Sequence, residues 1–130
     1  MGLPPKPLRS RGSFKDAPPD WPERAFTPDT GTLCLRPEFR RDIVFRREDI
    51  RERQPDGPFD LVLCRNLAFT YFADDLQRRT LAAIERRLWP GGLLVLGAHE
   101  RLPADAGAFV RARATLPIWR GLGKEEGGPR

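Results

Sequence analysis

Two apolar runs of strand length, separated by a segment of helical periodicity, constrain the fold of this chain more than any other feature. The first run, Phe59–Cys64, is apolar at every position except Asp60, and the second is Leu93–Leu96. Nearly continuous apolar runs are typical of strands buried on both faces of a parallel sheet. The apolar positions between the runs fall on one helical stripe: Leu76, Leu81, Ile84 and Leu88. Strand, helix and strand joined by short loops predict a right-handed βαβ unit and hence an α/β fold.

The limits of this helix are marked by residues with capping and helix-breaking chemistry. Asp74 or Asp75 can cap the first turn, and Gln77 stands where a capping-box partner of Asp74 belongs. Pro90-Gly91-Gly92 is expected to stop the helix before the second strand begins. The sequence therefore predicts a helix of about four turns between the two strands.

Weaker patterns predict further elements on both sides of the βαβ unit. Trp21–Phe26 favours a short helical turn, Leu33–Leu35 a short strand, and Ile43–Phe45 a better strand. Phe109–Val110 and Ile118–Trp119 are compatible with either closing strands or helix. These elements would complete the sheet around the central unit.

The arginine content of the chain raises the question of a nucleic-acid partner. The net charge is +5 at pH 7, and every basic residue except Lys6, Lys15 and Lys124 is an arginine. The guanidinium group of arginine forms paired hydrogen bonds with the phosphate groups of nucleic acids. Here, however, the arginines are scattered among Asp and Glu and form no basic block. The pattern indicates that the arginines form a solvated surface, and we rank nucleic-acid binding last among the possible functions.

Cysteine and histidine content excludes a zinc site, and the apolar runs are too short for a membrane protein. Cys34 and Cys64 lie far apart, and one histidine cannot complete a site with them. Cys64 lies inside an apolar run and is expected to be a buried free thiol. Met1–Lys15 lacks the apolar core of a signal peptide, and no run approaches the length of a membrane span. The sequence predicts a soluble cytoplasmic protein with neither a metal nor a membrane partner.

Three loop segments are expected at the ligand-binding edge of the sheet. In open α/β sheets, ligands bind beyond the carboxyl ends of the strands. Glu48–Arg51, Arg65–Tyr71 and Gly97–Leu102 each follow a predicted strand. Candidate binding residues are therefore sought in these segments.

The order of short motifs along the chain is specific. Cys64-Arg65-Asn66 ends the first apolar strand, Tyr71-Phe72 follows, Pro90-Gly91-Gly92 ends the helix, and Gly97-Ala98-His99-Glu100 ends the second strand. This order, over roughly Ser13–Arg120, resembles the CheR-type methyltransferases. The resemblance implies a Rossmann-like class I methyltransferase sheet, of which this chain carries a part, and S-adenosylmethionine as the cofactor.

The resemblance also implies which residues contact the cofactor. By position in the family motifs, these are Asp49 with Ile50, and Asn66 with Leu67. The Asp49 carboxylate could accept a hydrogen bond from the adenine amino group. The Asn66 amide leaves a buried strand at its carboxyl end and can both donate and accept near the sulfonium or the amino-acid portion. Without the resemblance, Asp49 would pass for a charged loop residue and Asn66 for a turn residue.

Two further residues are candidates for the transfer step itself. Tyr71 is expected near the transferred methyl group because of its place after Cys-Arg-Asn. Arg65 has three possible roles: it is a surface cation, an internal ion-pair partner of Asp60, or a contact to the substrate carboxylate. The family esterifies glutamate side chains of receptor proteins, so the resemblance implies a protein or small carboxylate substrate.

The chain departs from the family pattern in ways that shape the expected domain organisation. Residues 1–32 contain neither the glycine-containing motif nor the acidic ribose contact of the family, so the N-terminal strands of the sheet are expected to be missing. Tyr71 stands one residue further from Asn66 than usual, and Gly-Ala-His-Glu replaces Gly-His-Ser-Glu. The predicted organisation is a flexible Pro/Arg-rich segment over 1–20, a partial CheR-like methyltransferase domain over 21–120 and a disordered tail over 121–130.

Three functions remain open at this level. The favoured one is a CheR-type methyltransferase in truncated form. The second is an inactive relative that serves as a binding or regulatory module. A nucleic-acid-binding basic domain comes last.

Overall fold

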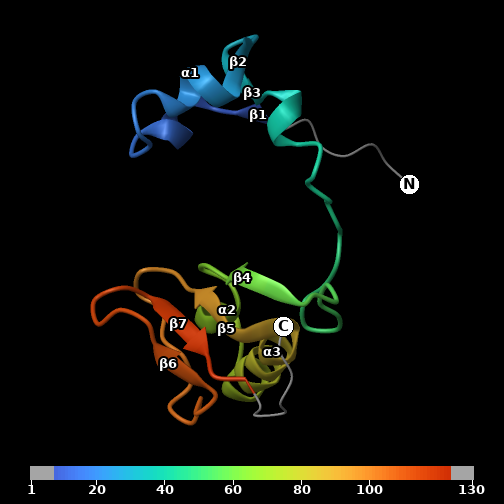
Figure 1. Ribbon diagram of the computed structural model, residues 1–130, viewed down its shortest axis with the longest axis vertical. Helices are drawn as coiled ribbons and strands as arrows, with labels where there is room; N and C mark the ends of the chain where they lie inside the picture. Colours follow the sequence, from blue (N-terminus) through green and yellow to red (C-terminus); the bar gives the residue numbers. More distant parts are fainter. Residues whose placement is uncertain (1–7, 124–130) are drawn as a thin grey trace. The chain divides into compact units, whose positions relative to one another are not determined.

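The computed structural model describes residues 8–123 and divides the chain into two compact units, Met1–Arg47 and Glu48–Arg130 (Figure 1). This division falls well beyond residue 20, where the sequence places its first boundary. The domain limits taken from the sequence stay predictions. Most of the predicted tail, residues 124–130, lies outside the described residues, as do residues 1–7 of the predicted flexible segment.

The first unit is built on a small antiparallel sheet. Its described elements are β1 (Leu8–Arg9), η1 (Arg11–Phe14), α1 (Trp21–Ala25), β2 (Phe26–Asp29), β3 (Thr32–Leu35) and η2 (Pro37–Phe39), with the strand order β1-β3-β2. Thr30 and Gly31 both have positive φ, 38° and 79°, as the tight turn between β2 and β3 requires. The predicted helical turn at Trp21 and the short strand at Leu33 are confirmed.

The second unit contains the predicted βαβ unit. Its described elements are β4 (Phe59–Leu63), α2 (Ala68–Tyr71), α3 (Asp74–Arg87), β5 (Leu88–Val95), β6 (Phe109–Arg111) and β7 (Ile118–Gly121). Among the described strands the order is β4-β5-β7-β6, with β4 and β5 parallel and the other pairs antiparallel. Phe109 and Ile118, left open between strand and helix, both begin strands. The fold is therefore α/β, with a mixed sheet.

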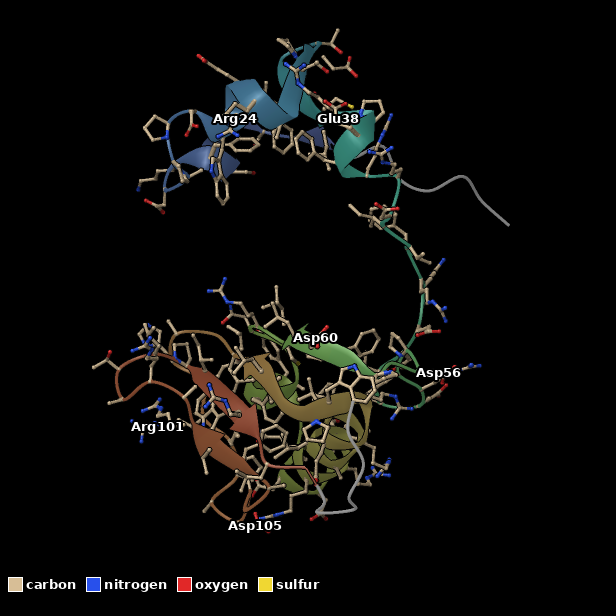
Figure 2. All side chains as sticks on the ribbon, in the orientation of Figure 1. Arg24, Glu38, Asp56, Asp60, Arg101 and Asp105 are labelled. Atoms are coloured by element: carbon tan, nitrogen blue, oxygen red, sulfur yellow. The ribbon has the colours of Figure 1, made fainter. Side chains whose placement is uncertain are left out.

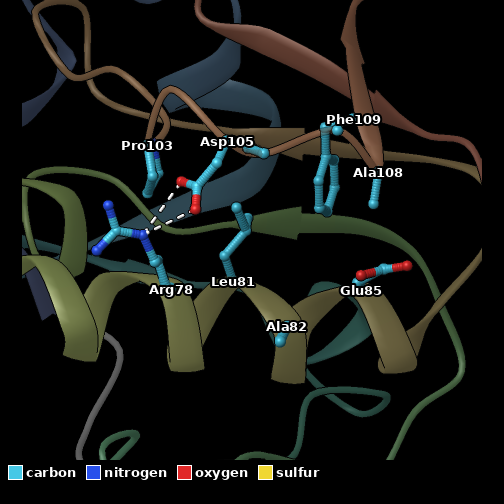
Figure 3. Close-up of a pocket in the computed structure, with 10 residues that line it drawn as sticks. Arg78, Leu81, Ala82, Glu85, Pro103, Asp105, Ala108 and Phe109 are labelled. Carbon is cyan, nitrogen blue, oxygen red and sulfur yellow. Dashed lines mark hydrogen bonds and ion pairs between the residues drawn. The ribbon is translucent and has the colours of Figure 1, made fainter.

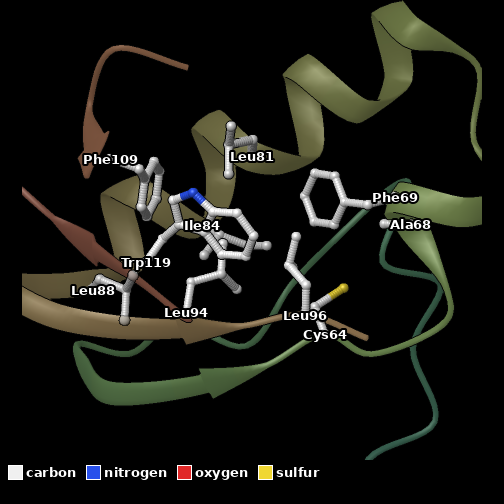
Figure 4. Packing of buried hydrophobic residues seen from close by; sticks show 10 residues of the cluster. All are labelled: Cys64, Ala68, Phe69, Leu81, Ile84, Leu88, Leu94, Leu96, Phe109 and Trp119. Carbon is white, nitrogen blue, oxygen red and sulfur yellow. The ribbon is translucent and has the colours of Figure 1, made fainter. Parts of the chain in front are cut away.

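The core of the second unit lies between α3 and one face of the sheet (Figure 4). Leu81 and Ile84 of the predicted stripe are buried, and they face Leu94 of β5, which is fully buried. Phe109 and Trp119 close the core from β6 and β7. Burial of such side chains supplies the main driving force for folding, at about 25 cal/mol per Å² of apolar surface removed from water.

One prediction about β4 is wrong: this strand is not buried on both faces. Leu61 is 52% and Leu63 65% exposed, whereas Cys64 at the strand end is buried. α3 covers one face of the sheet, and β4 has a described neighbour, β5, on one side only. The apolar run in the sequence therefore correctly indicates a strand but overestimates its burial.

The strand predicted at Ile43–Phe45 is not formed. These residues have no regular structure, and their side chains are 45% (Ile43), 76% (Val44) and 54% (Phe45) exposed. A strand is stable only when its backbone N–H and C=O groups are paired with a neighbour. No described strand pairs with this segment, so its β-forming composition is not sufficient.

The predicted ends of α3 also need correction. Ala73 is the N-cap, without a side-chain cap, so Asp74 and Asp75 lie inside the first turn. Gln77 donates through Nε2 to the Phe72 carbonyl, 2.9 Å away, rather than completing a capping box. The helix ends at Arg87, before Pro90-Gly91-Gly92, which lies in an irregular part of β5. Acidic residues still favour the positive N-terminal end of the helix.

Candidate functional site

The loops that follow β4 and β5 meet at the carboxyl ends of these parallel strands. Asn66, just after β4, adopts a left-handed backbone with φ 55°. Gly97, just after β5, lies so close that an added Cβ would overlap Asn66 Oδ1 and stand 2.8 Å from Glu100 Oε1. Only glycine fits this approach without displacing the Asn66 side chain.

Glu100 connects the two loops. Its carboxylate Oε1 accepts hydrogen bonds from the backbone N–H of Asn66 at 2.7 Å and of Gly97 at 2.6 Å. Its Oε2 accepts a third from the Thr70 hydroxyl, at 2.7 Å. The Glu100 residue is only 6% exposed; its bond from Gly97 is buried, and those from Asn66 and Thr70 are partly buried.

The surroundings of Glu100 favour its ionised form. Burial alone would raise the pKa of this carboxyl, but hydrogen bonds from Thr70 and from the amides of Gly97, Asn66 and Leu67 outweigh burial and lower the pKa. A carboxyl with a lowered pKa stabilises the fold at neutral pH and loses that contribution as the pH falls through its folded-state pKa. Glu100 is thus a charged bridge at neutral pH.

A cleft of about 400 Å³ runs along β4 beside this junction. Its walls come from β4, from α3 and from the segment between residues 50 and 55. The lining residues are Ile50, Gln54, Pro55, Phe59, Leu61, Val62, Leu63, Cys64, Arg65, Leu67, Thr80, Ile84 and Arg87. A largely apolar cleft with a few polar groups at its margin is the usual form of a small-molecule site.

The structure brings together part of the set predicted from the sequence. Ile50, Arg65 and Leu67 all line the cleft, although Ile50 comes from a segment well before β4. Asn66 lies between two lining residues and is bonded through its backbone N–H to Glu100. These positions agree with a ligand site at the strand ends.

Asp49 adjoins the cleft in sequence but is engaged elsewhere. Its carboxylate accepts hydrogen bonds from the Arg51 side chain, with Nε 2.9 Å from Oδ1, and from the Arg51 backbone N–H at 3.0 Å. The Arg51 guanidinium lowers the pKa of Asp49 to about 2. Asp49 is not among the residues that line the cleft.

The side chains of Tyr71 and Cys64 differ in solvent exposure. Tyr71 ends α2, is 75% exposed and does not line the cleft. Cys64 is buried and free, as predicted. Burial raises the pKa of the Cys64 thiol, which therefore stays protonated at neutral pH.

Sequence reasoning misses the role of Glu100 and Thr70. Glu100 belongs to the Gly97–Glu100 motif, but nothing in the motif assigns a contact to it. The available signal is its place three residues after a glycine at the end of a buried strand. Two of its partners, Asn66 and Thr70, lie 34 and 30 residues earlier in the sequence, and pairing at that range cannot be predicted from spacing.

A second hollow, of about 170 Å³, lies between α3 and the segment from Pro103 to Phe109 (Figure 3). Arg78 Nε donates to both carboxylate oxygens of Asp105, at 3.1 and 3.0 Å. The Arg78 guanidinium lowers the pKa of Asp105. None of the predicted site residues lines this smaller hollow.

The remaining charged groups lie mainly on the surface, as Arg24 and Arg101 illustrate (Figure 2). Arg24 pairs with Asp20 at 3.0 Å in an exposed helical ion pair. Within residues 8–123, no three His, Cys, Asp or Glu side chains gather as metal ligands would. In the same part of the chain, no helix has the length and apolar character needed to cross a bilayer.

Comparison of the amino-acid sequence with known proteins matches the chain to a family. Residues 10–117 match the family described as CheR methyltransferase, SAM binding domain. A 104.1 kDa uncharacterised protein of Rhodobacter capsulatus is 36% identical over 107 residues, which are 82% of this chain and 11% of that protein. Chemotaxis protein methyltransferase 1 of Vibrio cholerae is 30% identical over 113 residues, 86% of this chain and 37% of the relative.

A shorter match has a similar level of identity. Chemotaxis protein methyltransferase 1 of Pseudomonas aeruginosa is 37% identical over 73 residues, 55% of this chain and 26% of the relative. In each of these matches the chain spans well under half of the relative's length. The family match itself extends over both units and includes the β4 strand end, the βαβ unit and Glu100. The chain therefore belongs to the CheR methyltransferase family and is part of its S-adenosylmethionine-binding domain, with a partial class I methyltransferase sheet.

Proposed function

We propose that this chain forms part of an S-adenosylmethionine-dependent methyltransferase that transfers a methyl group to a carboxylate, such as a protein glutamate. One observation supports this most strongly. Ile50, Arg65 and Leu67, which come from two separate segments, line one cleft at the carboxyl end of β4. Together with membership of the CheR family, their convergence points to a cofactor and acceptor site there.

The lining of the cleft fits the cofactor chemically. Ile50, Leu63 and Leu67 offer apolar surface to a flat adenine ring. Asn66 is not a lining residue but stands between two of them, Arg65 and Leu67, and its side-chain amide can donate and accept hydrogen bonds. Asp49 is bonded to Arg51 and does not line the cleft, so its contact with adenine stays a prediction from the sequence. When bound, S-adenosylmethionine supplies a methyl group on a positively charged sulfur.

The chain's main task in this reaction is alignment. An acceptor carboxylate is ionised at neutral pH, with a pKa of about 4, and needs no general base. Its oxygen forms a bond to the methyl carbon as the carbon–sulfur bond breaks, which gives a methyl ester and S-adenosylhomocysteine. Arg65 lines the cleft and can pair with the acceptor carboxylate. Tyr71, on the exposed end of α2, stays a prediction for the acceptor side.

Calorimetric titration with S-adenosylmethionine tests the proposal. We expect saturable binding to the chain and a loss of about tenfold or more for Asn66→Ala, because the left-handed turn and its amide are removed. Arg113→Ala, an exposed change outside the cleft, is the matched control and should leave the affinity unchanged. Equal affinity in both variants, or no binding by the wild-type chain, would contradict the proposal.

A binding or regulatory module is the second candidate, because Tyr71, the residue predicted near the transferred methyl group, is 75% exposed and does not line the cleft. Transfer of labelled methyl groups to an acidic peptide separates the two candidates. Label in the peptide supports the methyltransferase, whereas binding without transfer supports the module. A cytoplasmic location stays a prediction from the sequence.

A further inference from the structure

The Glu100 carboxylate joins the loop after β4, the loop after β5 and helix α2. Its two oxygens together accept hydrogen bonds from Asn66, Gly97 and Thr70, at distances from 2.6 to 2.7 Å. Glu100 is itself in the loop after β5. Removing its carboxylate would break the side-chain hydrogen bonds that connect these three pieces of chain.

These bonds are stronger than ordinary ones because the acceptor is charged and buried. Hydrogen bonds to an ionised group are roughly twice as strong as bonds between neutral groups, and Glu100 is 6% exposed. The donors are the backbone amides of Asn66 and Gly97 and the hydroxyl of Thr70, all of them neutral groups. The two backbone N–H donors have fixed directions, so the carboxylate constrains the geometry of the backbone as well as the local charge.

The loop held by Glu100 has an unusual backbone. Asn66 has φ 55°, and Leu67 has φ −137° and ψ −96°. Residues in sparsely populated conformations persist only where the surrounding structure holds them, and they concentrate at ligand sites. Two contacts supply that support: the hydrogen bond from the Asn66 backbone N–H to Glu100, and the close contact of the Asn66 side chain with Gly97.

We propose that Glu100 is a positioning residue, which fixes Asn66 and Leu67 in the conformation that contacts S-adenosylmethionine. The inference rests on the proposed function, because Asn66 and Leu67 are cofactor contacts only within it. Glu100 itself acts through these residues and does not touch the cofactor. A merely structural role would change stability and leave the affinity of the folded protein unaltered.

The test compares wild type with Glu100→Gln, which keeps the size of the side chain and removes its charge. Amide NMR without cofactor reports on the loop: we expect the Asn66 and Gly97 amide signals to move and their hydrogen exchange to accelerate by about tenfold or more. Calorimetry with S-adenosylhomocysteine reports on the site: we expect about tenfold or more weaker binding in folded Glu100→Gln. Glu85→Gln, the same change on α3, is the control and should alter neither readout.

The outcomes separate this inference from the proposed function. Altered Asn66 and Gly97 amides with unchanged cofactor affinity would overturn the inference and leave the proposed function standing. If wild type binds no S-adenosylhomocysteine, the proposed function fails and the inference fails with it. Should Glu100→Gln not fold, Thr70→Val removes one donor and keeps the charge. We expect this variant to lose affinity to a smaller extent, and an affinity equal to that of Glu85→Gln would overturn the inference.

Discussion

Two carboxylates near the cleft have lowered pKa values for different physical reasons. Asp49 is in a loop and is held by one neighbouring cation, Arg51, which lowers the pKa of Asp49 to about 2. Glu100 is buried and is held by neutral donors from three segments of the chain. The Asp49–Arg51 pair is local in sequence, and water can replace it. The hydrogen bonds of Glu100 depend on the folded arrangement of β4 and β5.

The Asp49–Arg51 pair gives a direct prediction at this scale. Arg51→Ala should raise the pKa of Asp49 from about 2 toward the ordinary value of about 3.9. The pKa rises because the substitution removes the Arg51 guanidinium, which stabilises the ionised form of the Asp49 carboxyl. An NMR titration of the Asp49 carboxyl measures the shift, with Arg53→Ala as the control. A pKa that stays near its wild-type value in Arg51→Ala would show that Arg51 is not the cause.

Individual residues differ in how far the sequence predicts them. Arg65 and Leu67 are expected at the ligand edge because they directly follow a predicted strand, and they line the cleft. The contacts of Glu100 are not predictable in this way, because its partners lie on separate elements. Local chain order predicts which residues come after a strand, but not which loops a buried side chain joins.

At the scale of elements, α3 and β5 form the centre of the core of the second unit. Leu81 and Ile84 of α3 pack over Leu94 of β5 and over Leu96, which follows β5; both leucines are fully buried (Figure 4). The helical stripe is predictable from its period. The predictions of a capping box at Asp74 and of a strand at Ile43–Phe45 are wrong, because capping depends on side-chain direction and a strand depends on a partner.

Truncation of the central β5 side chain tests this packing. Leu94→Ala should lower the free energy of unfolding by about 2–5 kcal/mol, because it removes buried apolar surface and leaves a cavity. Leu116→Ala, at a side chain that is largely exposed, should cost less than about 1 kcal/mol. Denaturant titration measures both values. Similar losses in the two variants would mean that the core is not centred on β5.

At the scale of the whole chain, the two units differ in how directly they bear on function. All residues of the cleft and of the Glu100 junction belong to the unit from Glu48 onward. The α/β class of this unit is predictable, because two apolar runs and an apolar helical stripe specify it jointly. The burial of β4 is not, because a strand's exposure depends on which elements cover its other face and edge.

The central claim is that the cleft along β4 receives S-adenosylmethionine. The most direct test is to record the backbone amide signals of the whole chain by NMR as S-adenosylhomocysteine is added. We expect saturable shifts concentrated at Ile50, Asn66, Leu67 and Gly97, with little change around Arg78 and Asp105 at the second hollow. Shifts centred on the second hollow, or no shifts at saturating ligand, would contradict the claim.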